Sequence, residues 1–338
     1  MKRLRSFLGL CLLATAGCVA AEPPRHNLFV VATVNNNFVV GSKLTTVSGL
    51  FQRGADNTYA HFGLNFPYLV SLAIDPRDPQ VMYAASINGV LCTTDGGGTW
   101  RIGTSWDLTE PKDVWIDPHA PDTIYLALPD GIAVSTDRGR TWPRRETGLP
   151  ERGKYTQTVK VDRTQAGRAL IGCESGIYLT EDTAGRWRRV FASKATVTDL
   201  RQSPHDPKVW IATTQNDGAL RSGDGGLTWQ PIAGVPSAEA LYNAAFDPAN
   251  PQRIAIGSWT YGVIVTEDGG ATWTARNTGL PEDHCVFRVG IDPDNGRLYA
   301  GVYRDAIYAS DDSGRTWRKD GLDGALVYNF FFVPKATK

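Results

Sequence analysis

Two aspartates and an arginine occupy equivalent positions in repeated segments of this sequence, and their side chains could act in glycoside cleavage. Asp113 and Asp199 each lie four residues before the polar residue that ends a short apolar segment, and Arg288 takes this position in a later segment. Paired carboxylates roughly 5 to 10 Å apart are what glycoside cleavage requires, and an arginine opposite them could hold an anionic or hydroxylated group. Asp113 and Asp199 are therefore catalytic candidates, and Arg288 is a ligand-binding candidate. The charges could instead neutralise one another across a channel, with no chemistry.

The same position is polar in every segment that aligns in this way. Its occupants are Ser71, Asp113, Thr158, Asp199, Asn243, Arg288 and Asn329. Positions one and three residues before the end of the segment are mostly apolar, as at Ile74 and Leu72. Because side chains alternate along a strand, this pattern predicts a polar ring that faces a central channel. Asn243 and Asn329 join Arg288 as ligand-binding candidates, although a wet channel needs polar lining in any case.

These segments belong to a repeated unit marked by the string Ser/Thr-x-Asp-x-Gly-x-Thr-Trp. Five nearly perfect copies contain Asp95, Asp137, Asp224, Asp268 and Asp312, and a degraded copy contains Asp182. Successive aspartates are 42, 45, 42, 44 and 44 residues apart. An aspartate can accept hydrogen bonds from backbone N–H groups of its own turn, and glycine permits positive φ. The string therefore predicts a hairpin turn, and we interpret its aspartates as structural rather than catalytic.

Each string is embedded in a unit of four short predicted strands, the first of which often ends in Asp-Pro. Four antiparallel strands per 40-odd residues are typical of a β-propeller blade. The segment from Leu28 to Thr58 repeats the second to fourth strands in degraded form, and Ala325 to Val333 supplies only a first strand. The sequence predicts an all-β, single seven-bladed β-propeller. Its last blade is shared between the N-terminal strands and the C-terminal innermost strand, which leaves no sheet edge exposed.

The repeated string is that of the BNR or Asp-box repeat, and the chain resembles BNR/Asp-box propellers over nearly all of its predicted mature length. These include bacterial sialidases, xyloglucanases, sortilin-type receptor ectodomains and photosystem II assembly-factor-like proteins. The Asp-Pro loops at Asp75, Asp117 and Asp247 and the Gly-Leu-Pro-Glu linkers at Gly148 and Gly279 look most like the last three. The sialidases' Arg-Ile-Pro string does not occur, and xyloglucanases of this type resemble two facing propellers rather than one. The resemblance implies a noncatalytic binding or assembly scaffold, or else a carbohydrate hydrolase, because the box marks a fold and not an activity.

Several aromatic residues fall in segments that the strand order places on the face opposite the boxes. That face receives the links between second and third strands and between repeats, where binding residues usually lie. The aromatic candidates there are Trp106, Trp259, Tyr261 and Tyr303. Flat rings beside polar groups suit sugar or peptide binding, so we expect a protein or glycan partner at this face. Exposed aromatics can also simply cover the ends of blades.

The first 21 residues have the pattern of a secretory signal peptide, with basic residues, an apolar run and a small-residue end at Ala21. The mature domain is then predicted to span residues 22–338 and to be exported, either periplasmic or extracellular. A lipid anchor at Cys18 is the alternative, although Thr15 stands where a lipoprotein signal has an aliphatic residue. No later apolar run approaches the roughly 20 residues of a transmembrane span. The longer link from Val34 to Ser48 is expected to form an extra hairpin over the channel mouth.

The charge balance argues against a nucleic-acid partner. The chain has 35 basic and 35 acidic residues, and the loss of Lys2, Arg3 and Arg5 with the signal peptide leaves 32 basic residues. Nucleic-acid binding normally needs a basic excess. The histidines are scattered, and no metalloprotease string or phosphate-binding glycine loop occurs. We therefore expect no metal and no cofactor.

Overall fold

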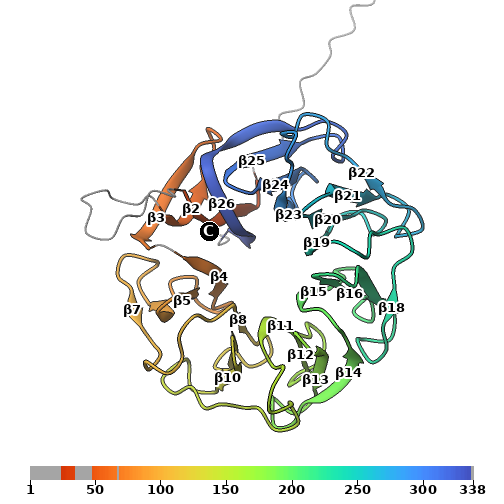
Figure 1. Cartoon of the computed structure of the whole chain (residues 1–338). Helices are drawn as coiled ribbons and strands as arrows, with labels where there is room; N and C mark the ends of the chain where they lie inside the picture. Colours follow the sequence, from red (N-terminus) through yellow and green to blue (C-terminus); the bar gives the residue numbers. More distant parts are fainter. Residues whose placement is uncertain (1–23, 35–47, 67, 336–338) are drawn as a thin grey trace, which may run out of the picture.

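The computed structural model describes residues 24–34, 48–66 and 68–335, and the regular elements of this part of the chain are β-strands. The predicted signal peptide, the alternative anchor at Cys18 and the inserted segment 35–47 lie outside these residues. Figure 1 shows the sheets following one another around a common centre, with the first strand of each repeat nearest to it. The part of the chain that the structure describes contains no helix long and apolar enough to cross a membrane.

Four sheets contain four strands each, and each strand pairs antiparallel with the next along the chain. Their strands are β4 (Leu69–Ile74), β5 (Met82–Ser86), β6 (Gly89–Thr93) and β7 (Arg101–Ile102); β11 (Thr156–Val161), β12 (Ala169–Cys173), β13 (Gly176–Thr180) and β14 (Arg188–Ala192); β15 (Val197–Gln202), β16 (Trp210–Thr214), β17 (Ala219–Ser222) and β18 (Gln230–Pro231); β19 (Leu241–Phe246), β20 (Ile254–Ser258), β21 (Gly262–Thr266) and β22 (Thr274–Ala275). The outermost strands begin later than predicted. Trp100, for example, precedes β7, and its indole N–H donates to Gly97 O within the turn.

One sheet has three strands, where the sequence predicts four. It consists of β8 (Asp113–Ile116), β9 (Ile124–Leu128) and β10 (Gly131–Ser135). An isolated bridge between Ala133 and Arg144 stands in place of the fourth strand. The preceding residue, Pro143, accepts a hydrogen bond from Val134 N but has no N–H to donate, which shortens the ladder here.

The remaining sheet joins the two ends of the described chain. Its order is β23 (Val286–Ile291), β24 (Leu298–Val302), β25 (Asp305–Ser310), β26 (Arg318–Pro334), β1 (His26–Thr33), β2 (Ser48–Arg53) and β3 (Tyr59–Asn65). The first part of β26 pairs with β25, and the last part pairs antiparallel with β1, where Phe330 lies opposite Val30. One 17-residue strand therefore belongs to both the last repeat and the N-terminal strands.

Apolar side chains fill the spaces between successive sheets. Val90 and Val114, for example, belong to one buried cluster that joins the β4–β7 sheet to the β8–β10 sheet. Another cluster joins β1 and β2 to the β4–β7 sheet through Val31 and Leu72. Because each sheet is covered on both faces, middle strands such as β5 are buried along their whole length, and this burial favours nearly continuous apolar sequences.

The box turns and the Asp-Pro loops lie on one face, which we call the turn face. In the turn after β6, Asp95 accepts hydrogen bonds from Thr99 N at 2.9 Å and from Thr93 Oγ1 at 2.7 Å. Gly97 has a φ of +94°, which glycine adopts without strain. The turn is also joined to the Asp-Pro loop of its own sheet, since Gly96 N donates to Gln80 O at 2.9 Å. Equivalent turns occur at the other five box aspartates.

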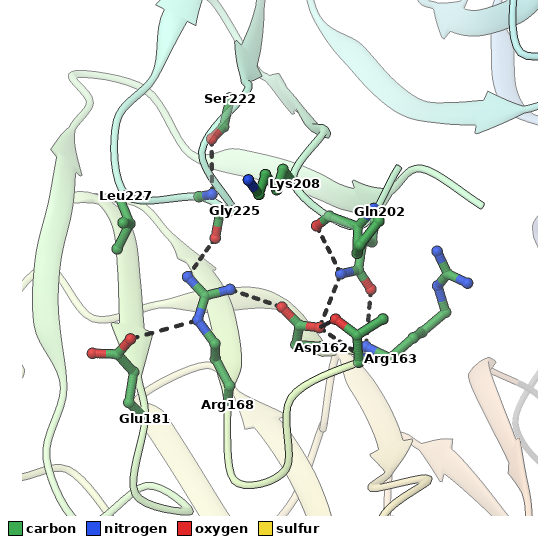
Figure 2. A network of polar contacts seen from close by, with 12 residues as sticks. Asp162, Arg163, Arg168, Glu181, Gln202, Lys208, Ser222, Gly225 and Leu227 are labelled. Atoms are coloured by element: carbon green, nitrogen blue, oxygen red, sulfur yellow. Dashed lines mark hydrogen bonds and ion pairs between the residues drawn. The ribbon is translucent and has the colours of Figure 1, made fainter. Parts of the chain in front are cut away.

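A buried arginine, Arg168, connects two neighbouring sheets at the turn face (Figure 2). Arg168 donates through Nη1 to Asp162 Oδ2 at 2.8 Å and through Nη2 to Gly225 O in the box turn of the next sheet. Gln202 Nε2 reaches Asp162 Oδ1 at 3.0 Å from that next sheet. The side chains of Arg168 and Asp162 are only 4% and 1% exposed. This face is therefore held by polar groups that have left water.

Candidate functional site

The central ring, Ser71, Asp113, Thr158, Asp199, Asn243, Arg288 and Asn329, lies on the innermost strands. Most of these strands contain a register shift, such as the one between Val197 and Asp199 on β15 or between Leu241 and Asn243 on β19. A bulge of this kind redirects neighbouring side chains. The first five ring members are almost completely buried. The ring therefore borders the centre, but simple alternation does not describe where its side chains go.

Asp113 is enclosed by hydrogen bonds on β8. It accepts from Ser71 Oγ at 2.7 Å, from Thr158 Oγ1 and Val159 N at 3.1 Å each, and from Lys160 Nζ. Burial acts to raise the pKa of Asp113, but the ammonium group of Lys160 and the other donors outweigh it and leave this pKa below its ordinary value. Asp113 is thus an ionised and fully engaged carboxylate.

Asp199 has a different cation as its partner. Arg201 Nε donates to Asp199 Oδ2 at 2.7 Å, and Ala244 N of the next sheet lies 3.4 Å from the same oxygen. Burial acts to lower the pKa of Arg201, yet the charge of Asp199 raises it above its ordinary value. Each candidate catalytic carboxylate is therefore paired with a cation.

On the opposite side of the ring, Asn243 and Arg288 form hydrogen bonds with backbone groups of the next innermost strand. Asn243 accepts from Val289 N at 2.9 Å and donates to Val289 O at 2.9 Å. Arg288 donates to the carbonyl oxygens of Tyr328 and Phe287. Burial is the main cause that lowers the pKa of Arg288 to about 10. Innermost strands have unpaired edges, and ring side chains satisfy their backbone groups from the neighbouring sheet.

Lys160 and Arg201 are site residues that the sequence reasoning missed. Each lies two positions after a ring member on the same strand, so strand periodicity alone could have placed it beside the ring. Together with Asp113, Asp199 and Arg288 they form what we call the charged waist. These five residues border one small cavity at the centre together with Asn329.

A cavity of about 770 Å³, the turn-side cavity, extends from the charged waist toward the turn face. Its outer lining includes Asp75, Pro76 and Pro79 of an Asp-Pro loop. Its inner end includes Asp113, Lys160 and Arg201, and its walls are largely apolar; the wall residues include Leu72, Ile74, Trp115, Phe330 and Phe332. The sequence placed Asp113 and Asn329 at the central channel, and both line this cavity. It did not predict the cavity itself, because strand order says nothing about the space that side chains leave.

Aromatic rings gather at that opposite face, the loop face. Trp259 and Tyr303 lie with ring centroids 5.0 Å apart, and Tyr242 lies 6.0 Å from Trp259 and 4.5 Å from Phe287. Tyr328 continues the group at 6.3 Å from Phe287. We call these five residues the aromatic platform. Trp259 is 37% exposed, so the platform offers ring surface to solvent.

The platform arises from bulges as well as loops. Trp259 and Tyr303 come from the β20–β21 and β24–β25 links, as the sequence predicts. Tyr242, Phe287 and Tyr328 are the residues passed over at the register shifts of β19, β23 and β26. No sequence signal used above marks those bulges, so the sequence analysis missed Phe287 and Tyr328.

The other two aromatic candidates lie outside this cluster. Trp106 is 89% exposed in the segment after β7. Tyr261 is 41% exposed beside the platform residue Trp259 in sequence, and its carbonyl oxygen accepts from Asn277 Nδ2. Within residues 24–34, 48–66 and 68–335, no three His, Cys, Asp or Glu side chains are grouped so as to hold a metal ion.

No family model matches the chain. The other comparisons with known proteins identify its architecture. Among curated proteins, the oligoxyloglucan-reducing end-specific xyloglucanase of Emericella nidulans is 26% identical over 164 residues. That match covers 43% of this chain and 19% of the enzyme. This chain thus corresponds to a minor part of that relative's length.

Solved structures of two different proteins resemble the chain. The GH74 xyloglucanase from Xanthomonas campestris superposes with a TM-score of 0.66 at 17% identity, over 81% of this chain and 51% of the enzyme. YCF48 bound to D1 peptide superposes with a TM-score of 0.57 at 19% identity, over 75% of this chain and 83% of that protein. The chain spans about half the length of the GH74 enzyme. Similarity at these identities concerns architecture alone, and it identifies this all-β chain as a β-propeller.

Proposed function

We propose that this chain is a noncatalytic binding or assembly propeller whose loop face engages a protein segment or a glycan. The aromatic platform carries the proposal, because its rings present contact area at small entropic cost beside a partly exposed tryptophan. Aromatic residues clustered in this way are typical energetic centres of binding surfaces. YCF48, a structural neighbour, is described in complex with a peptide.

The proposed scaffold has seven blades, the last built jointly by β1–β3 and the end of β26. The antiparallel pairing of β26 with both β25 and β1 supports it. So do the buried clusters, which join successive sheets along the described chain and also join β1–β2 to the β4–β7 sheet. In this proposal, the box aspartates fix the turns, since each is bonded within its own turn.

The proposed domain begins at residue 22 after an N-terminal signal peptide, and the protein acts in the periplasm or outside the cell. The succession of a basic region, an apolar region and small residues up to Ala21 supports export. A lipid at Cys18 is the competing form. Mass spectrometry of the N-terminus of the protein recovered from an exporting host distinguishes cleavage after Ala21 from a diacylated Cys18.

A glycoside hydrolase that uses Asp113 and Asp199 is the second candidate, and the similarity to GH74 xyloglucanases favours it. A general acid at neutral pH needs a raised pKa, whereas that of Asp113 is lowered. Asp199 is paired with Arg201. The contacts of both carboxylates therefore support a network that stabilises the ring more than they support catalysis.

The test is a peptide array and a glycan array probed with the mature protein and with two variants. Trp259→Ala/Tyr303→Ala should lose the bound ligand, whereas Trp106→Ala, which removes an exposed ring elsewhere on the same face, should keep it. Equal binding by all three proteins would refute the platform as the contact surface. A chromogenic glycoside panel run alongside tests the second candidate. Turnover that disappears in Asp113→Asn/Asp199→Asn would replace the binding proposal with the hydrolase.

A further inference from the structure

The turn-side cavity combines apolar walls with a charged inner end. Leu72, Ile74 and Trp115 line the cavity, while Lys160 and Arg201 border its inner end and the small central cavity. Drug-sized ligands typically occupy cavities of roughly 300 to 1,000 Å³ that are mainly apolar with a few polar groups. The volume of about 770 Å³ falls in this range.

The charged waist holds one more cation than anion. Asp113 is paired with Lys160, and Asp199 is paired with Arg201. Among the described residues, Arg288 has no carboxylate partner, and it donates hydrogen bonds to backbone carbonyl oxygens. Arg288 is partly buried, and a partly desolvated cation without a counter-ion is unfavourable. An anion that reaches the waist would supply the missing charge.

Charges that act on the pKa of Arg288 come from other residues of the charged waist. Burial lowers its pKa to about 10, and the charges of Asp199, Arg201 and Asp113 all act on it. Arg288 therefore belongs to the same charge cluster as the residues at the inner end of the cavity. A negative group near Arg201 would be stabilised by Arg288 as well.

We propose that the turn-side cavity binds a small amphipathic carboxylate. Its apolar body packs against Leu72, Ile74 and Trp115, and its carboxylate reaches Lys160 and Arg201 at the charged waist. The cavity thereby selects a monoanion with an aliphatic chain or a single aromatic ring. This site lies toward the turn face and is independent of the ligand proposed for the loop face.

Isothermal titration with sodium octanoate tests the proposal on the mature protein. We expect a dissociation constant below about 100 µM for octanoate. Octanamide has the same chain without the charge, and acetate has the charge without the chain, so each should bind at least about tenfold more weakly. Absence of octanoate binding, or equal binding of octanamide, would overturn the proposal.

Two charge variants should shift the affinity in opposite directions. Arg288→Gln removes the excess cation and should weaken octanoate binding at least about tenfold, because the waist is then neutral. Asp199→Asn adds to the excess and should tighten binding. A general disturbance of the structure would weaken binding in both, and that result would contradict the charge argument.

A third variant separates the cavity from the charges. Ile74→Trp should fill part of the cavity while it leaves every charged residue in place, so octanoate binding should be lost and circular dichroism should show an intact fold. If Arg288→Gln does not fold, Asp199→Asn and Ile74→Trp decide the question. Unchanged octanoate affinity in a folded Ile74→Trp variant would place the ligand elsewhere and refute the site.

Discussion

The turn face and the loop face of this propeller use the same strands but different chemistry. At the turn face, box turns are bonded to Asp-Pro loops, and Arg168 links two sheets while almost fully buried. At the loop face, Trp259 and Tyr261 leave more than a third of their surface in water. The face with the strictly repeated sequence is thus the one that bonds sheets together. The face where repeats diverge is the one left open for contact.

The difference shows how a repeat scaffold can keep its architecture while its ligand changes. Each box turn needs the same internal hydrogen bonds, so these turns depend on residues that recur, such as the box aspartates. A contact surface has no such requirement and can draw single residues from a few repeats, as the aromatic platform does. If the loop face binds the ligand proposed for it, stability and recognition belong to separate ends of the same strands.

The largest effect is expected from breaking the buried ion pair at the turn face. Arg168→Ala leaves the Asp162 carboxylate, 1% exposed, without its cation, and it should lower the free energy of unfolding by about 3–5 kcal/mol. Guanidinium denaturation measures this. Arg186→Ala, which removes an exposed arginine from the box turn of the same repeat, is the matched control and should leave the midpoint in place. Similar losses in both variants would contradict a special role for the buried pair.

A smaller loss is expected midway between the faces, at the central ring. Asn243→Ala removes two hydrogen bonds to Val289 in the next sheet and leaves buried backbone groups unsatisfied, which should cost about 2 kcal/mol. Asn216→Ala, at an exposed loop position, serves as the reference in the same denaturation series. An equal stability for the two variants would show that the ring does not join the sheets.

The exposed rings of the loop face should contribute almost nothing to stability. Trp106 is 89% exposed, so Trp106→Ala should change the free energy of unfolding by no more than about 0.5 kcal/mol. The same thermal or denaturant unfolding measurement applies. A loss as large as that of Asn243→Ala would mean that this face also holds the fold together, and the contrast between the faces would fail.

The last effect concerns pH at the box turns and appears only under acidic conditions. Backbone and side-chain hydrogen bonds from Thr99 and Thr93 lower the pKa of Asp95 to about 2, against about 3.9 in an unfolded chain. The stabilising contribution is therefore fully present above about pH 4 and is lost as the pH falls through about 2. The difference in Tm between the wild type and Asp95→Asn should stay constant from pH 8 to pH 5 and shrink below pH 4. A difference that changes between pH 5 and pH 8 would contradict this assignment.

The sequence was informative about repeated features and uninformative about local departures from them. The turns at Asp95 and its equivalents have hydrogen bonds that the box string predicts, because both partners lie within a few residues of one another. The polar ring was also visible as a column of residues. The hydrogen bonds from this ring to the next sheet could not be predicted. The alternation of side chains shows which side of a strand a residue lies on, but it does not show which group in the next sheet it contacts.

Bulges explain most of what was missed at the candidate sites. Tyr242, Phe287 and Tyr328 join the aromatic platform because each is passed over by the pairing of its strand. Pro143 similarly replaces a predicted outer strand with a single bridge. The turn-side cavity depends on how side chains of several sheets leave space between them, and that space is a property of packing rather than of any one segment.

The double pairing of β26 has a consequence for the order of events during synthesis. β1 is synthesised long before β26, yet His26 faces Pro334 across one ladder. Contacts so distant in sequence form late and slowly. Until the final repeat emerges, β1 carries an open edge and its apolar neighbours, such as Val30, lack the cover that Phe330 provides. A chain interrupted before Arg318 would keep a strand edge available for aggregation or for proteases, so the N-terminal strands cannot be fully paired until synthesis has passed Pro334.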